Sequence, residues 1–106
     1  MAWEIKYHPL AKEELAKLDG SIRKIVLKGI LKVSANPKPQ TDGGYGKPLG
    51  NKGVNDLTGL LKIKFRDIGI RVVYKLVENK ETHEMYILVI SARADNEVYN
   101  LTGKRK

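Results

Sequence analysis

The segment LLKIKFRDIGIRVVY, residues 60–74, decides the fold of this chain. From Leu61 to Arg66 apolar and basic side chains alternate, a pattern typical of a β-strand with one apolar face and one cationic face. Asp67-Ile68-Gly69 is a turn signal, and residues 70–74 run back as a second strand. The segment therefore predicts a β-hairpin that gathers cations on one exposed surface.

The turn also sets the register of this hairpin. If Phe65 pairs with Ile70, Lys64 lies opposite Arg71, and Lys62, Lys64 and Arg66 share the cationic face. The side chains that then turn inward are Leu61, Ile63, Phe65, Ile70, Val72 and Tyr74. Like charges opposite each other destabilise a sheet, so the arrangement favours a polyanion that offsets the repulsion. The alternative is a solvated basic face that serves only solubility.

The composition supports a partner of opposite charge. The 106 residues suffice for one domain, residues 1–106, with a hydrophobic core. Twenty Lys and Arg residues against twelve Asp and Glu residues give a net charge of +8, which favours a nucleic acid or an acidic protein as partner. The sequence has no apolar run of the roughly 18 residues that a membrane helix needs, no secretory signal pattern and no cysteine. We expect a cytoplasmic protein without membrane, cofactor or metal.

The N-terminal third predicts a strand and two helices. Residues 3–7 alternate as a strand, and Pro9 suits the first turn of a helix that extends to residue 18. A second helix follows Gly20 and ends near Asn36-Pro37, because the residue before proline disfavours the helical conformation. Its apolar stripe comprises Ile22, Ile25, Val26, Gly29, Ile30 and Val33.

The remaining segments complete the predicted fold. Residues 36–56, rich in Pro and Gly, are expected to form a long loop. The apolar run 85–90 predicts a central strand covered on both faces, and residues 96–101 predict a short helix whose Val98 and Leu101 face the core. The order β-α-α-β-β-β indicates an α+β fold, in which two N-terminal helices pack on one face of a small antiparallel sheet.

These residues resemble the RelE/ParE superfamily of toxin–antitoxin toxins, and more closely its RelE branch of ribosome-dependent mRNA endonucleases. The resemblance covers nearly the whole chain, from the first strand and helix to residues 97–99. It includes residues 9–18, 49–50, 61–66, 69–74, 89–93 and 97–99. Its more specific motifs are the Lys-x-Lys strand, the arginine after the glycine turn, and the Arg-x5-Tyr ending.

The resemblance implies an active surface and a reaction. Family members use two lysines of this strand, the hairpin arginine, a later arginine and a C-terminal tyrosine. The matching residues here are Lys62, Lys64, Arg71, Arg93 and Tyr99. The implied chemistry is metal-independent attack of the RNA 2′-OH on its own phosphate, with Lys64 as general base and Arg93 as proton donor or its electrostatic equivalent.

The other implied roles concern RNA binding. Lys62 and Arg71 would brace the phosphate, Arg66 would add to the RNA-binding surface, and Tyr99 would stack on or orient a base. His8 and His83 lie at a strand–helix junction and in a polar turn, so we expect neither to take part.

The implied partners are a cognate antitoxin protein, the ribosome and mRNA, with promoter DNA bound only through the toxin–antitoxin complex. Two alternatives stay open at this point. One is a ParE-like toxin that poisons DNA gyrase without cutting RNA. The other is an inactive RNA-binding or promoter-binding module, whose affinity would fall steeply with salt.

Overall fold

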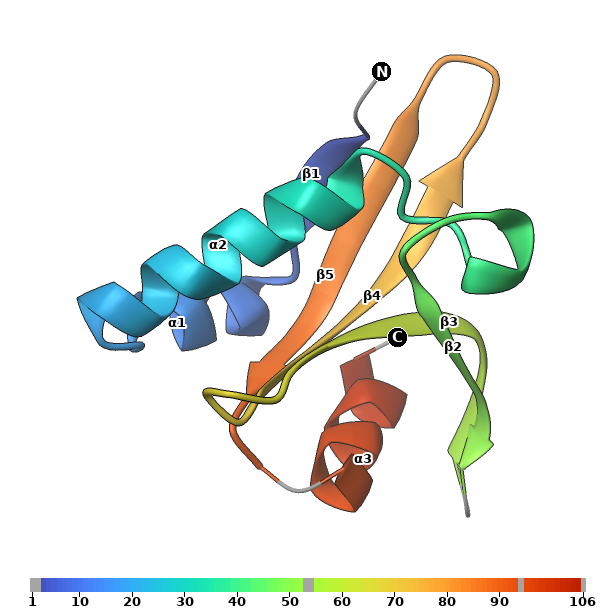
Figure 1. Ribbon diagram of the computed structural model, residues 1–106. Coiled ribbons are helices and arrows are strands. Elements are labelled where there is room, and N and C mark those ends of the chain that lie inside the picture. The colour runs from blue at the N-terminus through green and yellow to red at the C-terminus, as the bar shows by residue number, and fades with distance from the viewer. Residues whose placement is uncertain (1–2, 53–54, 94, 106) are drawn as a thin grey trace.

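The computed structural model describes residues 3–52, 55–93 and 95–105. The elements in chain order are β1 (Glu4–Tyr7), α1 (Pro9–Ala16), α2 (Gly20–Ser34), the short 3₁₀-helix η1 (Gln40–Asp42), β2 (Lys47–Lys52), β3 (Asn55–Phe65), β4 (Ile70–Glu78), β5 (His83–Ser91) and α3 (Asp95–Arg105). The described strands form a five-stranded sheet in the order β1-β5-β4-β3-β2 (Figure 1). The predicted α+β class is confirmed.

The hairpin β3–β4 has the register predicted from its turn. Phe65 pairs with Ile70, and Lys64 pairs with Arg71. Gly69 takes a positive φ of 68°, which glycine tolerates and which the tight turn requires. The side chains predicted to turn inward belong to, or pack against, one hydrophobic cluster.

The predicted all-antiparallel sheet is wrong at one edge, where β1 runs parallel to β5 with Ile5 opposite Met85. Parallel neighbours need a long crossover, and here everything from α1 to β4 supplies it. The two strands are too far apart in the chain for a local pattern to indicate this pairing.

The prediction that residues 36–56 form a loop is also wrong for the second half of this range. β2 occupies Lys47–Lys52, and β3 begins at Asn55. The order β-α-α-β-β-β therefore lacks one strand before the hairpin. Strand propensity does not indicate β2, because Pro48 and Gly50 are unfavourable in strands. Both are tolerated here because β2 is an edge strand whose register shifts between them.

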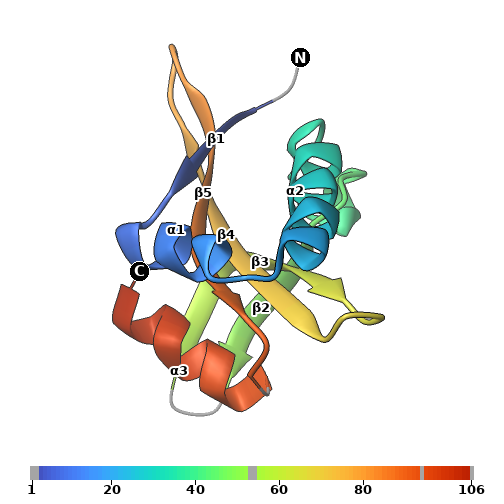
Figure 2. The same cartoon turned by 90° about the vertical axis from the view of Figure 1, so that its left-hand side faces the viewer.

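The helices lie on both faces of the sheet, as Figures 1 and 2 show. Ala11 of α1 and Val26 and Ile30 of α2 pack in one cluster with Tyr74 and Met85. This arrangement confirms the two N-terminal helices on a common face. Helix α3 covers the opposite face, and the members of the second cluster are Leu49, Leu57, Leu60, Val73, Leu88, Val89, Val98 and Tyr99.

The central strand β5 contributes to both clusters, as predicted, but its alternation is interrupted. Ile87 and Ile90 belong to the cluster under α1 and α2, whereas the consecutive residues Leu88 and Val89 belong to the cluster under α3. The register with β4 shifts at this point. A β-bulge thus turns two successive side chains to one face.

Helix α2 presents a narrower buried stripe than predicted. Val26, Ile30 and Val33 are buried, but Ile25 is 46% exposed. Gly29 belongs to the buried side for a different reason: a Cβ atom there would overlap the ring of Phe65. The glycine lets α2 approach the end of β3 closely.

Helix α3 is longer than the predicted 96–101, since it extends from Asp95 to Arg105. Lys104 and Arg105 occupy its last turn, where cations stabilise the helix dipole. Val98 is buried, as predicted. Within the described part of the chain, none of the helices combines the length and apolarity needed to span a bilayer.

Candidate active surface

The basic face of β3 is the face that α3 partly covers. Leu60, two positions before Lys62, packs in the cluster beneath α3. Because side chains two apart share a face, Lys62 and Lys64 point to the same side, with Arg71 directly opposite Lys64. Lys64 is exposed, whereas Lys62 and Arg71 are partly buried. The predicted clustering of these three cations is confirmed.

Tyr99 reaches this surface from α3. The Nζ atom of Lys62 donates a hydrogen bond to the Tyr99 hydroxyl at 2.8 Å and lies 5.4 Å from the centroid of its ring. Tyr99 as a whole is only 9% exposed and packs among the apolar residues beneath α3. The residue therefore combines core packing with a polar contact to a site lysine, and its ring offers little surface to a base.

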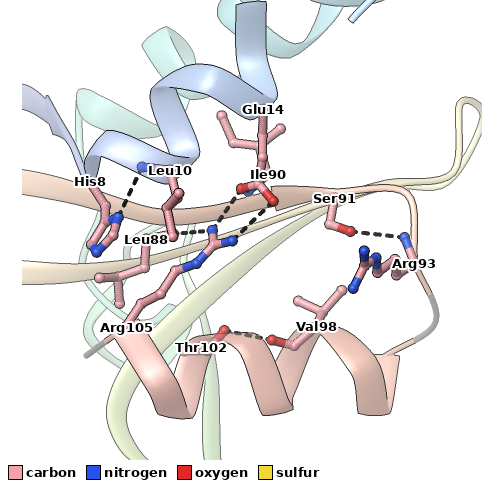
Figure 3. Close-up of polar contacts among 10 residues, drawn as sticks. All are labelled: His8, Leu10, Glu14, Leu88, Ile90, Ser91, Arg93, Val98, Thr102 and Arg105. Carbon is pink, nitrogen blue, oxygen red and sulfur yellow. Dashed lines mark hydrogen bonds and ion pairs between the residues drawn. The ribbon is translucent and has the colours of Figure 1, made fainter. Parts of the chain in front are cut away.

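Arg93 is held beside Arg71 through its main chain. The Nη1 atom of Arg71 donates to the Arg93 carbonyl oxygen at 2.8 Å. The Arg93 N–H donates in turn to the Ser91 hydroxyl at 3.0 Å (Figure 3). Ser91 was missed by the sequence argument, although its place two residues before Arg93 is the usual spacing for such a serine turn.

A hollow of about 470 Å³ opens at the end of the hairpin. Its lining residues are Lys64, Phe65, Arg66, Gly69, Ile70 and Arg71. Three of them are cations and none is a carboxylate. Arg66 lies in the turn after β3 rather than in the strand, so it reaches the hollow from the rim. Such a concave basic surface suits a phosphate group, which arginine can bind through two parallel N–H donors.

Both histidines make contacts away from the hairpin surface, and the expectation that neither takes part in the chemistry stays a prediction. The Nδ1 atom of His8 accepts a hydrogen bond from the Leu10 N–H and caps α1. The ring of His83 meets the ring of Trp3 edge-on at 5.0 Å. Among the residues that the structure describes, no three His, Cys, Asp or Glu side chains gather as metal ligands would.

No family model matches the chain. It is 26% identical over 105 residues to the mRNA interferase toxin RelE of Escherichia coli K12, a match that covers 99% of this chain and 98% of that protein. Among solved structures, a double arginine mutant of E. coli RelE in the free state matches with a TM-score of 0.71 and 25% identity, over 99% of this chain and 98% of the other.

One chain of the intact E. coli RelBE toxin–antitoxin complex matches with a TM-score of 0.64 and 22% identity, over 88% of this chain and 99% of the other. The relatives and the fold agree over nearly the whole length, and the resemblance inferred from the sequence motifs is confirmed. In sequence and in fold, the chain is thus similar to toxins of the RelE branch of the RelE/ParE superfamily.

Proposed function

We propose that this protein is the toxin of a type II toxin–antitoxin system and an endoribonuclease that cleaves mRNA in the ribosomal A site. The observation that carries the proposal is the geometry at the hairpin end. There Lys64 lies opposite Arg71, and the Arg71 guanidinium contacts the main chain of Arg93. The name of the E. coli relative, an mRNA interferase toxin, agrees with this reading.

The proposed reaction uses RNA as its own nucleophile. The 2′-oxygen attacks the neighbouring phosphorus, the bond to the 5′-oxygen breaks, and the products are a 2′,3′-cyclic phosphate and a 5′-OH. Lys64 takes the proton of the 2′-OH, and Arg93 donates a proton to the leaving oxygen or stabilises its charge. Lys62 and Arg71 stabilise the charge that builds on the non-bridging oxygens. Arg66 contacts RNA at the rim.

Tyr99 acts on this site through Lys62. Its hydroxyl accepts one of the lysine protons and so fixes the direction of the ammonium group. A fixed charge stabilises a transition state more effectively than a mobile one, because no reorganisation is needed during the reaction.

Dependence on the ribosome follows from the residue types. A lysine ammonium normally holds its proton at neutral pH, and an arginine is a poor acid there. We therefore propose weak activity on free RNA. The ribosome would hold the message in line for attack, and such positioning alone can accelerate a reaction greatly.

The partners follow from the same function. A cognate antitoxin would neutralise part of the +8 charge, and the structure of a relative in a toxin–antitoxin complex supports such a partner. Promoter DNA would be bound only by the toxin–antitoxin complex. Action on translating ribosomes places the protein in the cytoplasm.

The test maps the 5′ ends of a defined mRNA after mixing it with purified protein and translating ribosomes, beside a ribosome-free control. Cuts within the A-site codon, seen only with ribosomes, are expected. Lys28→Ala removes an exposed lysine of α2 and is the matched control for variants that remove a single cation from the site. An intact message in both reactions would overturn the proposal, and DNA breaks with purified gyrase would replace it with gyrase poisoning.

A further inference from the structure

The outer edge of β5 loses its strand partner before the strand ends. β1 accompanies β5 only from Glu84 to Ile87, and the His8 N–H makes the next main-chain contact, to the Ile87 carbonyl at 2.8 Å. Beyond this point the edge of β5 continues through the bulge at Leu88 to Ser91. Main-chain polar groups at such a buried edge need partners from outside the sheet.

An ion pair between α1 and α3 supplies these partners (Figure 3). Glu14 Oε1 accepts a hydrogen bond from the Ile90 N–H at 3.1 Å, and Arg105 Nη1 donates to the Leu88 carbonyl at 2.9 Å. The two side chains also meet each other in a two-pronged contact. Arg105 Nη1 lies 2.7 Å from Glu14 Oε1, and Arg105 Nη2 lies 3.2 Å from Glu14 Oε2.

This pair is sheltered from solvent, which distinguishes it from an ordinary surface ion pair. The Arg105 side chain is 9% exposed and the Glu14 side chain is 25% exposed. Planar, two-pronged arginine–carboxylate contacts fix orientation as well as distance. The last residue of α3 is thus tied at one point to α1 and to the β5 edge.

The same helix carries Tyr99, six residues before Arg105. At 1.5 Å per residue the two positions lie about 9 Å apart along a rigid helix. Thr102 between them is fully buried, and its hydroxyl donates to the Val98 carbonyl within the helix. A shift of the Arg105 end therefore moves the Tyr99 hydroxyl relative to Lys62.

We infer that Arg105 and Glu14 are positioning residues for the basic site. They hold α3 on the edge of β5 in the one placement at which the Tyr99 hydroxyl meets the Lys62 ammonium. The effect on cleavage rests on the proposed nuclease function, whereas the effect on the Lys62–Tyr99 contact does not. Neither residue touches the hollow at the hairpin end.

The kinetic test is a double-mutant cycle on A-site cleavage under single-turnover conditions. Arg105→Ala and Tyr99→Phe are each expected to lower the rate about tenfold or more, since small misplacements are costly in catalysis. The combined variant should be no slower than the slower single one, because both changes remove the same contact. Multiplying effects would overturn the inference, as would an unchanged rate in Arg105→Ala.

Two further variants separate positioning from general damage. Glu14→Gln keeps an oxygen for the Ile90 N–H and for Arg105, and it should retain most of the activity that Glu14→Ala loses. Lys104→Ala removes the exposed neighbouring charge of α3 and should leave cleavage unchanged. Equal losses in Glu14→Gln and Glu14→Ala would show that the charge, rather than the contact geometry, matters, and would contradict the assigned role.

A spectroscopic readout is independent of nuclease activity. In the full-length protein, the NMR signals of the Lys62 ammonium nitrogen and the Tyr99 ζ-carbon report their contact. Arg105→Ala and Glu14→Ala should shift both signals, Glu14→Gln should shift them less, and Lys104→Ala should leave them unchanged. Unchanged signals in folded Arg105→Ala and Glu14→Ala would overturn the positioning role. Wild-type protein that fails to cut mRNA would reject the proposed function alone, and these shifts would still decide the positioning.

Discussion

The ammonium nitrogen of Lys62 lies 2.8 Å from the hydroxyl oxygen of Tyr99, although 37 positions separate the two residues in the chain. This contact joins the basic strand β3 to the C-terminal helix α3. Because lysine can only donate, the tyrosine oxygen must accept, and the ammonium is directed by the helix. The helix that partly covers the basic face therefore also orients one of its cations.

Removal of the proposed acid or base should slow cleavage strongly without unfolding the protein. Lys64 and Arg93 are exposed, so Lys64→Ala and Arg93→Ala should leave the thermal midpoint nearly unchanged. Each should lower A-site cleavage by about a hundredfold or more, the usual contribution of a general acid or base. Primer extension on ribosome-bound mRNA measures the rate. Folded variants that cut at the full rate would reject these assignments.

Two substitutions of Tyr99 should separate its two contributions. Tyr99→Phe keeps the buried ring and loses only the hydroxyl, so the free energy of unfolding should change by about 1 kcal/mol or less. Tyr99→Ala empties a buried site and should cost about 3–5 kcal/mol. Urea denaturation measures both values. A loss as large in Tyr99→Phe as in Tyr99→Ala would mean that packing of the ring contributes little.

The hairpin could be predicted from sequence because its information is local. Alternation fixes the faces, the turn ending at Gly69 fixes the register, and the pairing of Lys64 with Arg71 follows from both. The parallel contact of β1 with β5 and the edge strand β2 could not be predicted. The first depends on distant segments, and the second contains Pro48 and Gly50.

The same distinction applies to the site. Lys62, Lys64 and Arg71 belong to one hairpin, so their grouping needs no tertiary information. The positions of Arg93 and Tyr99 were inferred by resemblance, and the structure adds their contacts to Arg71 and Lys62. Glu14 and Arg105 are 91 positions apart and sit in ordinary charged helix patterns. They have partners to bind only because β1 ends before β5 does and the bulge in β5 follows, which leaves main-chain groups of β5 without a strand partner.

The close approach of α2 to Phe65 predicts a coupling between Gly29 and that ring. Gly29→Ala should destabilise the wild-type fold by about 1–3 kcal/mol, because the new methyl group overlaps the ring. In a Phe65→Ala background the same change should stabilise by up to about 1 kcal/mol, the helix-propensity gain of alanine over glycine.

Chemical denaturation of the four proteins in this cycle measures the coupling. Gly20→Ala, at the start of α2 with open space around it, is the matched control and should behave alike in both backgrounds. Equal effects of Gly29→Ala with and without the Phe65 ring would contradict the prediction.

Tyr74 should make stability fall at alkaline pH. Its side chain is fully buried, and its hydroxyl donates to the Pro37 carbonyl oxygen at 2.8 Å, which fastens the segment after α2 to the sheet. Burial raises the pKa of Tyr74 above its ordinary value of about 10. Because the pKa is higher in the folded state than in the unfolded state, the stability that Tyr74 contributes is complete below about pH 10. It is lost progressively as the pH rises above that value.

Tyr74→Phe tests this relation. Near neutral pH the variant should be less stable by about 1–3 kcal/mol, because the Pro37 carbonyl loses its partner. Above about pH 10 the deficit should shrink, since only the wild type must keep Tyr74 protonated, at about 1.4 kcal/mol per pH unit. Urea denaturation between pH 7 and pH 11 measures the difference. Burial also raises the pKa of Tyr7, but that residue is common to both proteins and cancels. Tyr45→Phe, on a half-exposed ring, is the matched control, and a deficit for Tyr74→Phe that stays constant to pH 11 would contradict the prediction.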